Sequence, residues 1–202
     1  MKRKMVVALT GGIGSGKTTF LDAVKSLGAE GISCDEIVHG ELRSPVVRAK
    51  LRKIFGAGIF DSRGQVDRSA LGNIAFGRRR LLRRLENILH KRVVRQAQDR
   101  ARRTRKPLIF VDVPLLFEAG PRLWKADFFE MTVVVWAPRR ARIRWIEKRS
   151  GLSRSEILKR MNLQMPLEEK VKLADVVVDN SRSVPDLRRR ARNLYGNLEQ
   201  ML

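Results

Sequence analysis

The stretch Gly11-Gly12-Ile13-Gly14-Ser15-Gly16-Lys17-Thr18 follows directly on an apolar run at residues 5–9. It fits the phosphate-binding pattern G-x-x-x-x-G-K-[ST], with the strand, glycine-rich turn and helix that this pattern requires. Glycines allow successive backbone N–H groups and the start of the following helix to point at phosphate. The stretch therefore predicts a nucleotide-binding protein. The alternative is a glycine-rich turn that binds no ligand.

The side chains at the end of this loop have separate expected roles. Lys17 supplies a mobile cation for the outer phosphates, and Thr18 supplies a hydroxyl for Mg²⁺. The backbone from Gly12 to Thr18 is expected to cradle the phosphates.

Length and composition limit the class of protein. A chain of 202 residues with 43% hydrophobic residues suits one domain, or one domain with insertions. No segment approaches the length of a membrane span. The single cysteine, Cys34, excludes an internal disulfide and fits a reducing compartment, so we expect a cytoplasmic protein.

The charge is large and uneven. Lys and Arg number 43 against 21 Asp and Glu, which gives +22. Residues 78–106 contain 13 basic residues and two acidic ones, and therefore carry +11. Such a field attracts polyphosphates and nucleic acid. We favour a solvated basic helix face, because the stretch has no Phe, Tyr or Trp to stack on bases.

Five apolar, β-branched runs alternate with helical patterns, which predicts a parallel sheet with helices on both faces. The runs are residues 5–10, 31–34, 108–112, 132–136 and 176–179. The first helix is expected at residues 17–27 and a short one at 45–55, and Asp67 is expected to cap the next. A stripe of apolar residues from Leu81 to Ala101 at helical spacing predicts a further amphipathic helix.

Two segments are too long for simple crossovers between strands. Residues 36–107 are expected to form an inserted helical subdomain. Residues 138–173 form a second helical block, with a break at Gly151 and a cap at Ser153. Helices in this position often form lids.

Asp112 ends an apolar strand, where phosphate-loop enzymes carry their second acidic element, so it could hold Mg²⁺. The alternative is a turn or cap role. Val113-Pro114 follow, so no adjacent carboxylate is present to activate water, which favours phosphoryl transfer to an organic hydroxyl.

Asp35, at the end of the second predicted strand, is our candidate for the carboxylate near that hydroxyl. Its alternative role is the N-cap of a helix at 36–42, and the two roles can coexist.

Other chemical residues give weaker signals. His39 and His90 are the only histidines and form no metal-spaced cluster, so no zinc site is predicted. One or two arginines of the lid are expected to close on the transferred phosphoryl group and stabilise its charge. The arginines concerned are Arg139, Arg140, Arg142, Arg144, Arg149, Arg154 and Arg160.

The chain resembles the bacterial dephospho-coenzyme A kinases nearly from end to end. The most specific stretch is Asp112-Val113-Pro114-Leu115-Leu116-Phe117-Glu118. The resemblance also rests on Leu9 to Lys17, Cys34-Asp35-Glu36-Ile37-Val38, Gly64-Gln65-Val66-Asp67-Arg68, the 71–76 helix, Leu85 to His90, Arg160, Gln164, and Lys170 through Ala174-Asp175 to Asn180.

The resemblance implies ATP-dependent phosphorylation of the ribose 3′-hydroxyl of dephospho-coenzyme A, the last step of coenzyme A synthesis. It implies an α/β three-layer P-loop NTPase fold with a five-stranded parallel sheet ordered 2-3-1-4-5. The core would comprise residues 1–35, 108–145 and 174–202, with a helical substrate subdomain at 36–107 and a lid at 146–173. A monomer or small homo-oligomer is expected, with no membrane partner.

The resemblance also implies roles for individual residues. The catalytic set would be Lys17, Asp35, Arg149 and Arg160, and Mg²⁺ would be held by Thr18 and Asp112. ATP would be bound by Gly12, Ile13, Gly14, Ser15, Gly16, Lys17, Thr18, Thr19 and Asn180. Dephospho-coenzyme A would be bound by Asp35, His90, Leu115, Leu116 and Glu118.

Two positions depart from the family pattern. The family usually shows Asp-Ala-Asp where this chain reads Ser33-Cys34-Asp35, and it tends to have proline where this chain has Lys91. The lysine in place of proline concerns the helix break expected near His90 rather than the chemistry of the site. Two alternatives stay open, namely a P-loop kinase of another nucleoside or small metabolite, and a basic nucleic-acid-binding P-loop protein, whose binding would weaken steeply with salt.

Overall fold

The structure is a computed structural model that describes residues 3–76 and 78–202. Its contacts divide the chain into two compact units. The first comprises Met1–Ser33 and Arg100–Leu202, and the second is Cys34–Asp99. The boundaries expected for the helical subdomain (36–107) and the lid (146–173) stay predictions. Within the described residues, no helix is both long and apolar enough to cross a membrane.

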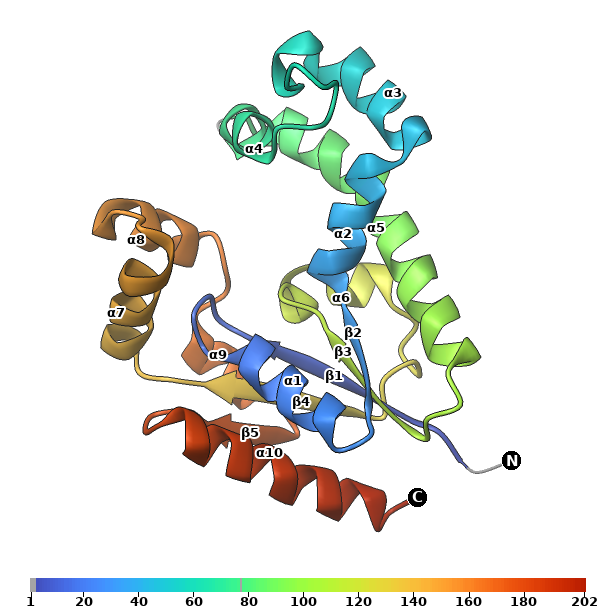
Figure 1. The fold of residues 1–202 in the computed structure, drawn as a ribbon, viewed down its shortest axis with the longest axis vertical. Coiled ribbons are helices and arrows are strands. Elements are labelled where there is room, and N and C mark those ends of the chain that lie inside the picture. The colour runs from blue at the N-terminus through green and yellow to red at the C-terminus, as the bar shows by residue number, and fades with distance from the viewer. Residues whose placement is uncertain (1–2, 77) are drawn as a thin grey trace. The chain divides into compact units, whose positions relative to one another are not determined.

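The first unit contains a five-stranded parallel sheet in the order β2-β3-β1-β4-β5 (Figure 1). The strands are β1 (Met5–Gly11), β2 (Glu30–Ser33), β3 (Leu108–Asp112), β4 (Met131–Trp136) and β5 (Val176–Asp179). The predicted fold class and strand order are confirmed. The second strand was predicted one residue too far, because Cys34 already belongs to the following helix.

Both faces of the sheet are covered. In β1, Val7 and Leu9 point into the core cluster that they share with helices α1 (Lys17–Ser26) and α10 (Val184–Glu199). Ala8, between them, points to the other face because side chains alternate along a strand. It is equally inaccessible to solvent. Burial on both faces explains why these strands read as continuous apolar runs rather than alternating ones.

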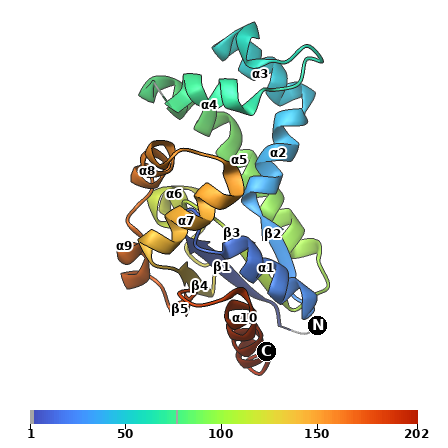
Figure 2. The same ribbon diagram turned by 60° about the vertical axis from the view of Figure 1, so that its left-hand side comes forward.

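Helices α1 and α10 pack together on one face of the sheet, and α10 runs along the bottom of Figure 1. Phe20 of α1 meets Phe110 of β3 edge to face, with ring centroids 5.8 Å apart. Helix α1 ends one residue earlier than predicted, and Gly28 after it adopts a positive φ of 113°. On the other face, the short helix α9 (Leu167–Lys172) packs against β4 (Figure 2).

Helices α7 (Arg139–Ser150) and α8 (Arg154–Asn162) pack together, and the lid predicted at 146–173 would begin inside α7. Their core consists of Ile143, Ile146 and Ile157. The predicted break and cap are confirmed. Gly151 terminates α7 with a φ of 65°, and Ser153 opens α8 in a capping box with Glu156.

The second unit is helical. It contains α2 (Cys34–Arg43), α3 (Pro45–Phe55), the 3₁₀ turn η1 (Ala57–Ile59), α4 (Arg68–Phe76) and most of α5 (Arg79–Arg103). Its core includes Leu42, Val47, Leu51, Ile59, Leu71 and Leu89. Asp67 caps α4 as predicted, since its Oδ1 accepts hydrogen bonds from the N–H groups of Ser69 and Ala70. Helix α5 runs unbroken through His90 and Lys91.

The capping box at α8 gives a prediction about the local stability of this helix. Ser153→Ala removes the side-chain acceptor of the Glu156 N–H, which costs about 1 kcal/mol at a helix N-cap. Amide hydrogens of α8 should then exchange about fivefold faster, while those of the sheet keep their protection. Ser155→Ala, at an exposed position of the same helix that makes no cap, is the control. Equal exchange in the two variants would contradict the prediction.

Candidate active site

The phosphate loop joins β1 to α1 and leaves the start of α1 open. Gly14 and Gly16 adopt positive φ values of 75° and 101°, which L side chains rarely adopt. The Gly16 carbonyl accepts the first helical bond, from Phe20 N–H at 3.0 Å. The N–H groups of the first turn, from Lys17 to Thr19, therefore have no acceptor within the helix. They form an anion site at the positive end of the helix dipole.

Residues from other elements hold this loop in shape. Asn180, at the end of β5, donates from Nδ2 to the Ser15 carbonyl at 2.8 Å, and its own N–H bonds the Trp136 carbonyl. Gln164 accepts from the Ile13 N–H at 2.9 Å. The Ile13 side chain packs against the α7–α8 core. Asn180, predicted to bind the nucleotide, thus contacts the loop that would bind it.

Two side chains of the loop suit a polyphosphate. The Ser15 hydroxyl is buried and has no hydrogen-bond partner within residues 3–76 and 78–202. Lys17 Nζ lies 3.5 and 3.4 Å from the carbonyls of Gly11 and Gly12, so it follows the loop rather than a carboxylate. A hydroxyl, an ammonium and a row of N–H groups are the donors that triphosphate oxygens require.

Asp112 lies at the same edge of the sheet as this loop. In the register of β3 against β1 it stands opposite Leu9, and the next N–H, that of Val113, bonds the Leu9 carbonyl at 2.8 Å. Asp112 is buried, whereas Thr18 is exposed in the first turn of α1. Both offer the oxygen ligands that Mg²⁺ prefers. The described residues contain no cluster of three or more His, Cys, Asp or Glu that could hold a metal ion.

Arg142 of α7 lies against the phosphate loop. It is only 6% exposed, and its Nε donates to the Ala137 carbonyl at 3.1 Å. A Cβ atom on Gly12 would collide with its guanidinium. Burial lowers the pKa of Arg142 while Glu168 raises it and Arg139 lowers it, and a guanidinium stays charged in any case. Arg149 and Arg160, the predicted catalytic arginines, are exposed on α7 and α8.

A buried ion pair joins α9 to the segment that follows Asp112. Lys170 of α9 is 0% exposed and donates to Glu118 Oε1 and to the Pro114 carbonyl, both at 2.8 Å. Glu118, in α6 (Leu116–Leu123), also accepts the Met165 N–H at 2.9 Å. Burial lowers the pKa of Lys170, the bond to Glu118 opposes this, and the charge of Lys17 lowers it further. We call this arrangement the Lys170 brace.

The remaining predicted substrate residues are placed as follows. Leu116 is buried and Leu115 is 37% exposed. Glu118 Oε2 is buried and has no hydrogen-bond partner in the described part of the chain. In the second unit, His90 of α5 is half-buried; burial lowers its pKa and Glu86 raises it.

The position of Asp35 needs a correction. It was placed at the end of the second strand, with a helix N-cap as its alternative role. The structure instead has α2 begin at Cys34, so Asp35 lies inside the first helical turn and is exposed. It is therefore neither a strand residue nor the cap. A carboxylate in a first turn still interacts favourably with the helix dipole.

Known proteins match this chain over nearly its whole length. A family model described as dephospho-CoA kinase matches residues 5–186. The dephospho-CoA kinase of Carboxydothermus hydrogenoformans is 38% identical over 188 residues, which cover 91% of this chain and 89% of that protein. The chain belongs to the dephospho-CoA kinase family.

Solved structures agree with this membership. The structure of TT1252 from Thermus thermophilus matches with a TM-score of 0.83 at 34% identity, covering 98% of this chain and 99% of that one. A dephospho-CoA kinase from Campylobacter jejuni matches with a TM-score of 0.69 at 26% identity, covering 96% and 97%.

The sequence did not single out three residues of this candidate dephospho-CoA kinase site. Gln164 and Lys170 contributed to the resemblance only, and Arg142 was one of seven lid arginines. The sequence does contain a signal for Arg142. It stands among Ala141, Ile143 and Ile146, which mark the buried side of α7, and arginine is rarely buried. No such signal identifies Lys170, whose partners lie about 50 residues away in sequence.

The Lys170 brace gives a prediction about stability. Lys170→Met leaves the Glu118 carboxylate without its cation and should lower the free energy of unfolding by about 3 kcal/mol, measured in urea. Adding Glu118→Gln removes the orphaned charge and should restore most of this loss. Lys172→Met, an exposed change on the same helix, should stay within about 0.5 kcal/mol of the parent. If Lys170→Met behaved like Lys172→Met, the brace would have no energetic role.

Proposed function

We propose that this chain transfers the γ-phosphoryl group of ATP to the ribose 3′-hydroxyl of dephospho-CoA, giving CoA and ADP in the last step of coenzyme A biosynthesis. The observation that carries the proposal is the phosphate loop at the open N-terminus of α1, within a chain that matches the dephospho-CoA kinase family over residues 5–186. The assignments of individual residues below are part of the proposal.

ATP binds with its phosphates over the start of α1. The N–H groups from Gly14 to Thr18 surround the phosphate oxygens, and the Ser15 hydroxyl gains the partner that it lacks within the described residues. Lys17 leaves the loop carbonyls and neutralises the outer phosphates. The loop needs little rearrangement, because Asn180 and Gln164 already hold its backbone.

Thr18 and Asp112 would hold Mg²⁺, directly or through water. A bound ion would supply positive charge that offsets the phosphate charge during transfer. The Lys170 brace fixes Pro114, two residues after Asp112, and so positions the end of β3 that carries this carboxylate.

Charge that develops on the transferred phosphoryl group is stabilised by cations fixed beforehand. Arg142 is the lid arginine whose guanidinium lies against the loop at Gly12. Because it is buried and bonded to the Ala137 carbonyl, little ordering is needed during the reaction. Arg149 and Arg160 remain candidates for a second arginine, and their exposure means that each would have to move to act.

Asp35 orients the 3′-hydroxyl and takes its proton late in the reaction. The hydroxyl oxygen bonds to the γ-phosphorus while the bond from phosphorus to the β–γ bridging oxygen breaks, and ADP leaves. In a loose transition state, positioning and neutralisation supply most of the catalysis. His90, whose lowered pKa keeps it neutral at pH 7, can donate or accept a hydrogen bond to dephospho-CoA.

The function is tested by coupled ADP release with dephospho-CoA, nucleosides and nucleoside monophosphates as acceptors. We expect turnover with dephospho-CoA, and Lys17→Ala should abolish it while leaving the melting temperature nearly unchanged. Lys25→Ala, an exposed change in the last turn of the same helix, should keep the parent rate. Preference for another acceptor would exclude the substrate, and activity within about tenfold of the parent in Lys17→Ala would exclude the role of Lys17.

The role of Asp35 predicts a large effect on rate from an isosteric change. Asp35→Asn should lower kcat by about 10²–10⁴-fold, with ATP affinity little changed because the phosphate loop is untouched. The neighbouring change Glu36→Gln, in the same exposed helical turn, controls for the loss of a charge at the start of α2. A near-normal kcat in Asp35→Asn would remove this residue from the mechanism.

A further inference from the structure

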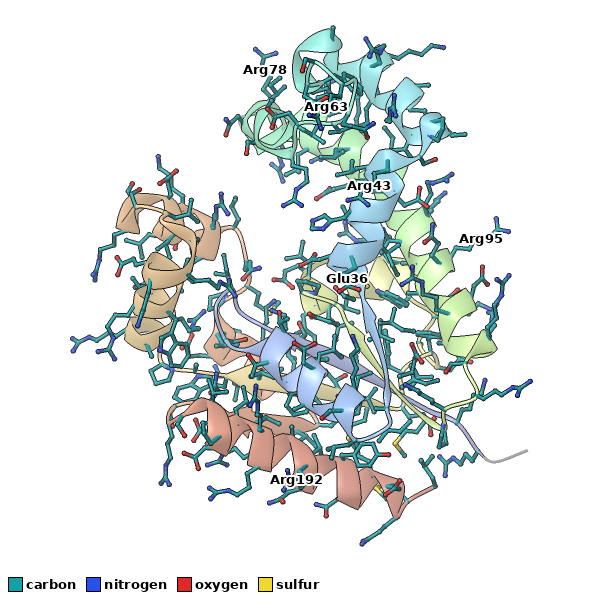
Figure 3. The ribbon with its side chains drawn as sticks, in the orientation of Figure 1. Glu36, Arg43, Arg63, Arg78, Arg95 and Arg192 are labelled. Atoms are coloured by element: carbon teal, nitrogen blue, oxygen red, sulfur yellow. The ribbon has the colours of Figure 1, made fainter. Side chains whose placement is uncertain are left out.

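The excess of positive charge in the second unit is not explained by the reaction. A kinase site needs a few cations around its phosphates, whereas residues 78–99 of this unit hold eight basic and two acidic side chains and so carry +6. Many of these side chains simply project into solvent, such as Arg95 of α5, which is 85% exposed and labelled in Figure 3. One group of them, however, surrounds a hollow.

A cavity of about 410 Å³ lies between α3 and α5, wholly within the second unit. Four of its lining side chains are cations, namely Lys50, Arg84, Lys91 and Arg92, and no acidic side chain lines it. Its other lining residues are Asn87 and the half-buried Ile54 and Ile88. The wall thus combines hydrogen-bond donors of positive charge with an apolar floor.

One of these cations is anchored from behind. Arg92 donates through Nε to the buried carboxylate of Glu41, which also accepts from Gln96. The guanidinium is therefore held at the cavity, with its terminal nitrogens not used by Glu41. Lys50, Arg84 and Lys91 have no acidic side chain within salt-bridge distance among the residues that the structure describes. Of the four cations that line the cavity, three have no carboxylate partner among the described residues, and the fourth is paired with Glu41 behind it.

The cavity lies on a different face of α5 from His90, the residue expected to meet dephospho-CoA. At 100° per residue, His90 stands about 120° around the helix axis from Arg84. Arg84, Ile88 and Lys91 follow the i, i+4, i+7 spacing of one face instead. Lys91 also stands where the family tends to have proline, so at this position the cavity has a cation that a proline would not supply.

We propose that this cavity is a binding site for a small polyphosphate anion, additional to the phosphate loop. Lys and Arg side chains with an amide donor match phosphate oxygens, and a single phosphate would leave most of the cations unpaired. A nucleic-acid strand fits less well, because no aromatic side chain lines the cavity to stack on a base. The apolar floor strengthens these contacts by excluding water around them.

The test is calorimetric titration of the full chain with inorganic tripolyphosphate. The parent should show two sites. Lys17→Ala should remove the site at the phosphate loop, and Arg84→Gln/Lys91→Gln should weaken the other by about tenfold or more, the size of one lost charge-assisted hydrogen bond. Retained ADP release in Arg84→Gln/Lys91→Gln shows that the variant is folded.

The matched control is Arg100→Gln/Arg103→Gln, which removes the same charge from exposed positions of α5 that do not line the cavity. Equal weakening in both double variants would show only general attraction to a basic chain and would overturn the proposal. A single site in the parent, lost in Lys17→Ala, would also overturn it. The proposal would also be overturned if Arg84→Gln/Lys91→Gln bound tripolyphosphate as tightly as the parent but bound duplex RNA more weakly. That result would assign the surface to nucleic acid.

Discussion

The open N-terminus of α1 imposes the main constraint on this enzyme. Its N–H groups must stay available for phosphate, so the loop before it contributes few hydrogen bonds to its own shape. Other elements supply them: Asn180 from the end of β5 holds the Ser15 carbonyl, and Gln164 from the lid holds the Ile13 N–H. Arg142 closes the remaining side, at Gly12. The glycines serve this arrangement as well as the ligand, because their neighbours approach where a Cβ would stand.

The same contacts connect the phosphate loop with α7, α8 and the loop that follows α8. Ile13 packs its side chain into the α7–α8 core, and its N–H meets the loop between α8 and α9. The next residue, Met165, is bound by Glu118, whose partner Lys170 also holds Pro114 near Asp112. A movement of the loop between α8 and α9 would therefore shift both the phosphate loop and the end of β3 that carries Asp112, through contacts shorter than 3 Å. A buried Lys–Glu pair costs desolvation, and its value here is that it fixes these segments relative to one another.

Positive charge is used differently in the two units. Around the phosphate loop, Lys17, Arg142 and Lys170 are fixed by packing and by hydrogen bonds to carbonyls, so they form a small cationic site. In the second unit the cations are numerous and mostly exposed. Four of them line the same cavity between α3 and α5. Net charge alone does not distinguish these cases, because the field of a +22 chain attracts any anion.

The sequence by itself determined the phosphate loop, the five parallel strands, the caps at Asp67 and Ser153, and the family, since these depend on local spacing and on continuous apolar runs. It misplaced Asp35, because whether a strand ends or a helix begins at Cys34 is set by packing rather than by propensity. It gave Arg142 no priority over six other arginines, and it gave Lys170 and Gln164 no role. Only the tertiary structure decided these, because their partners are brought together by folding from distant parts of the chain. Arg142 and Lys170 are buried, and each must have specific hydrogen-bond partners there, since an unpaired polar group in the interior would be costly.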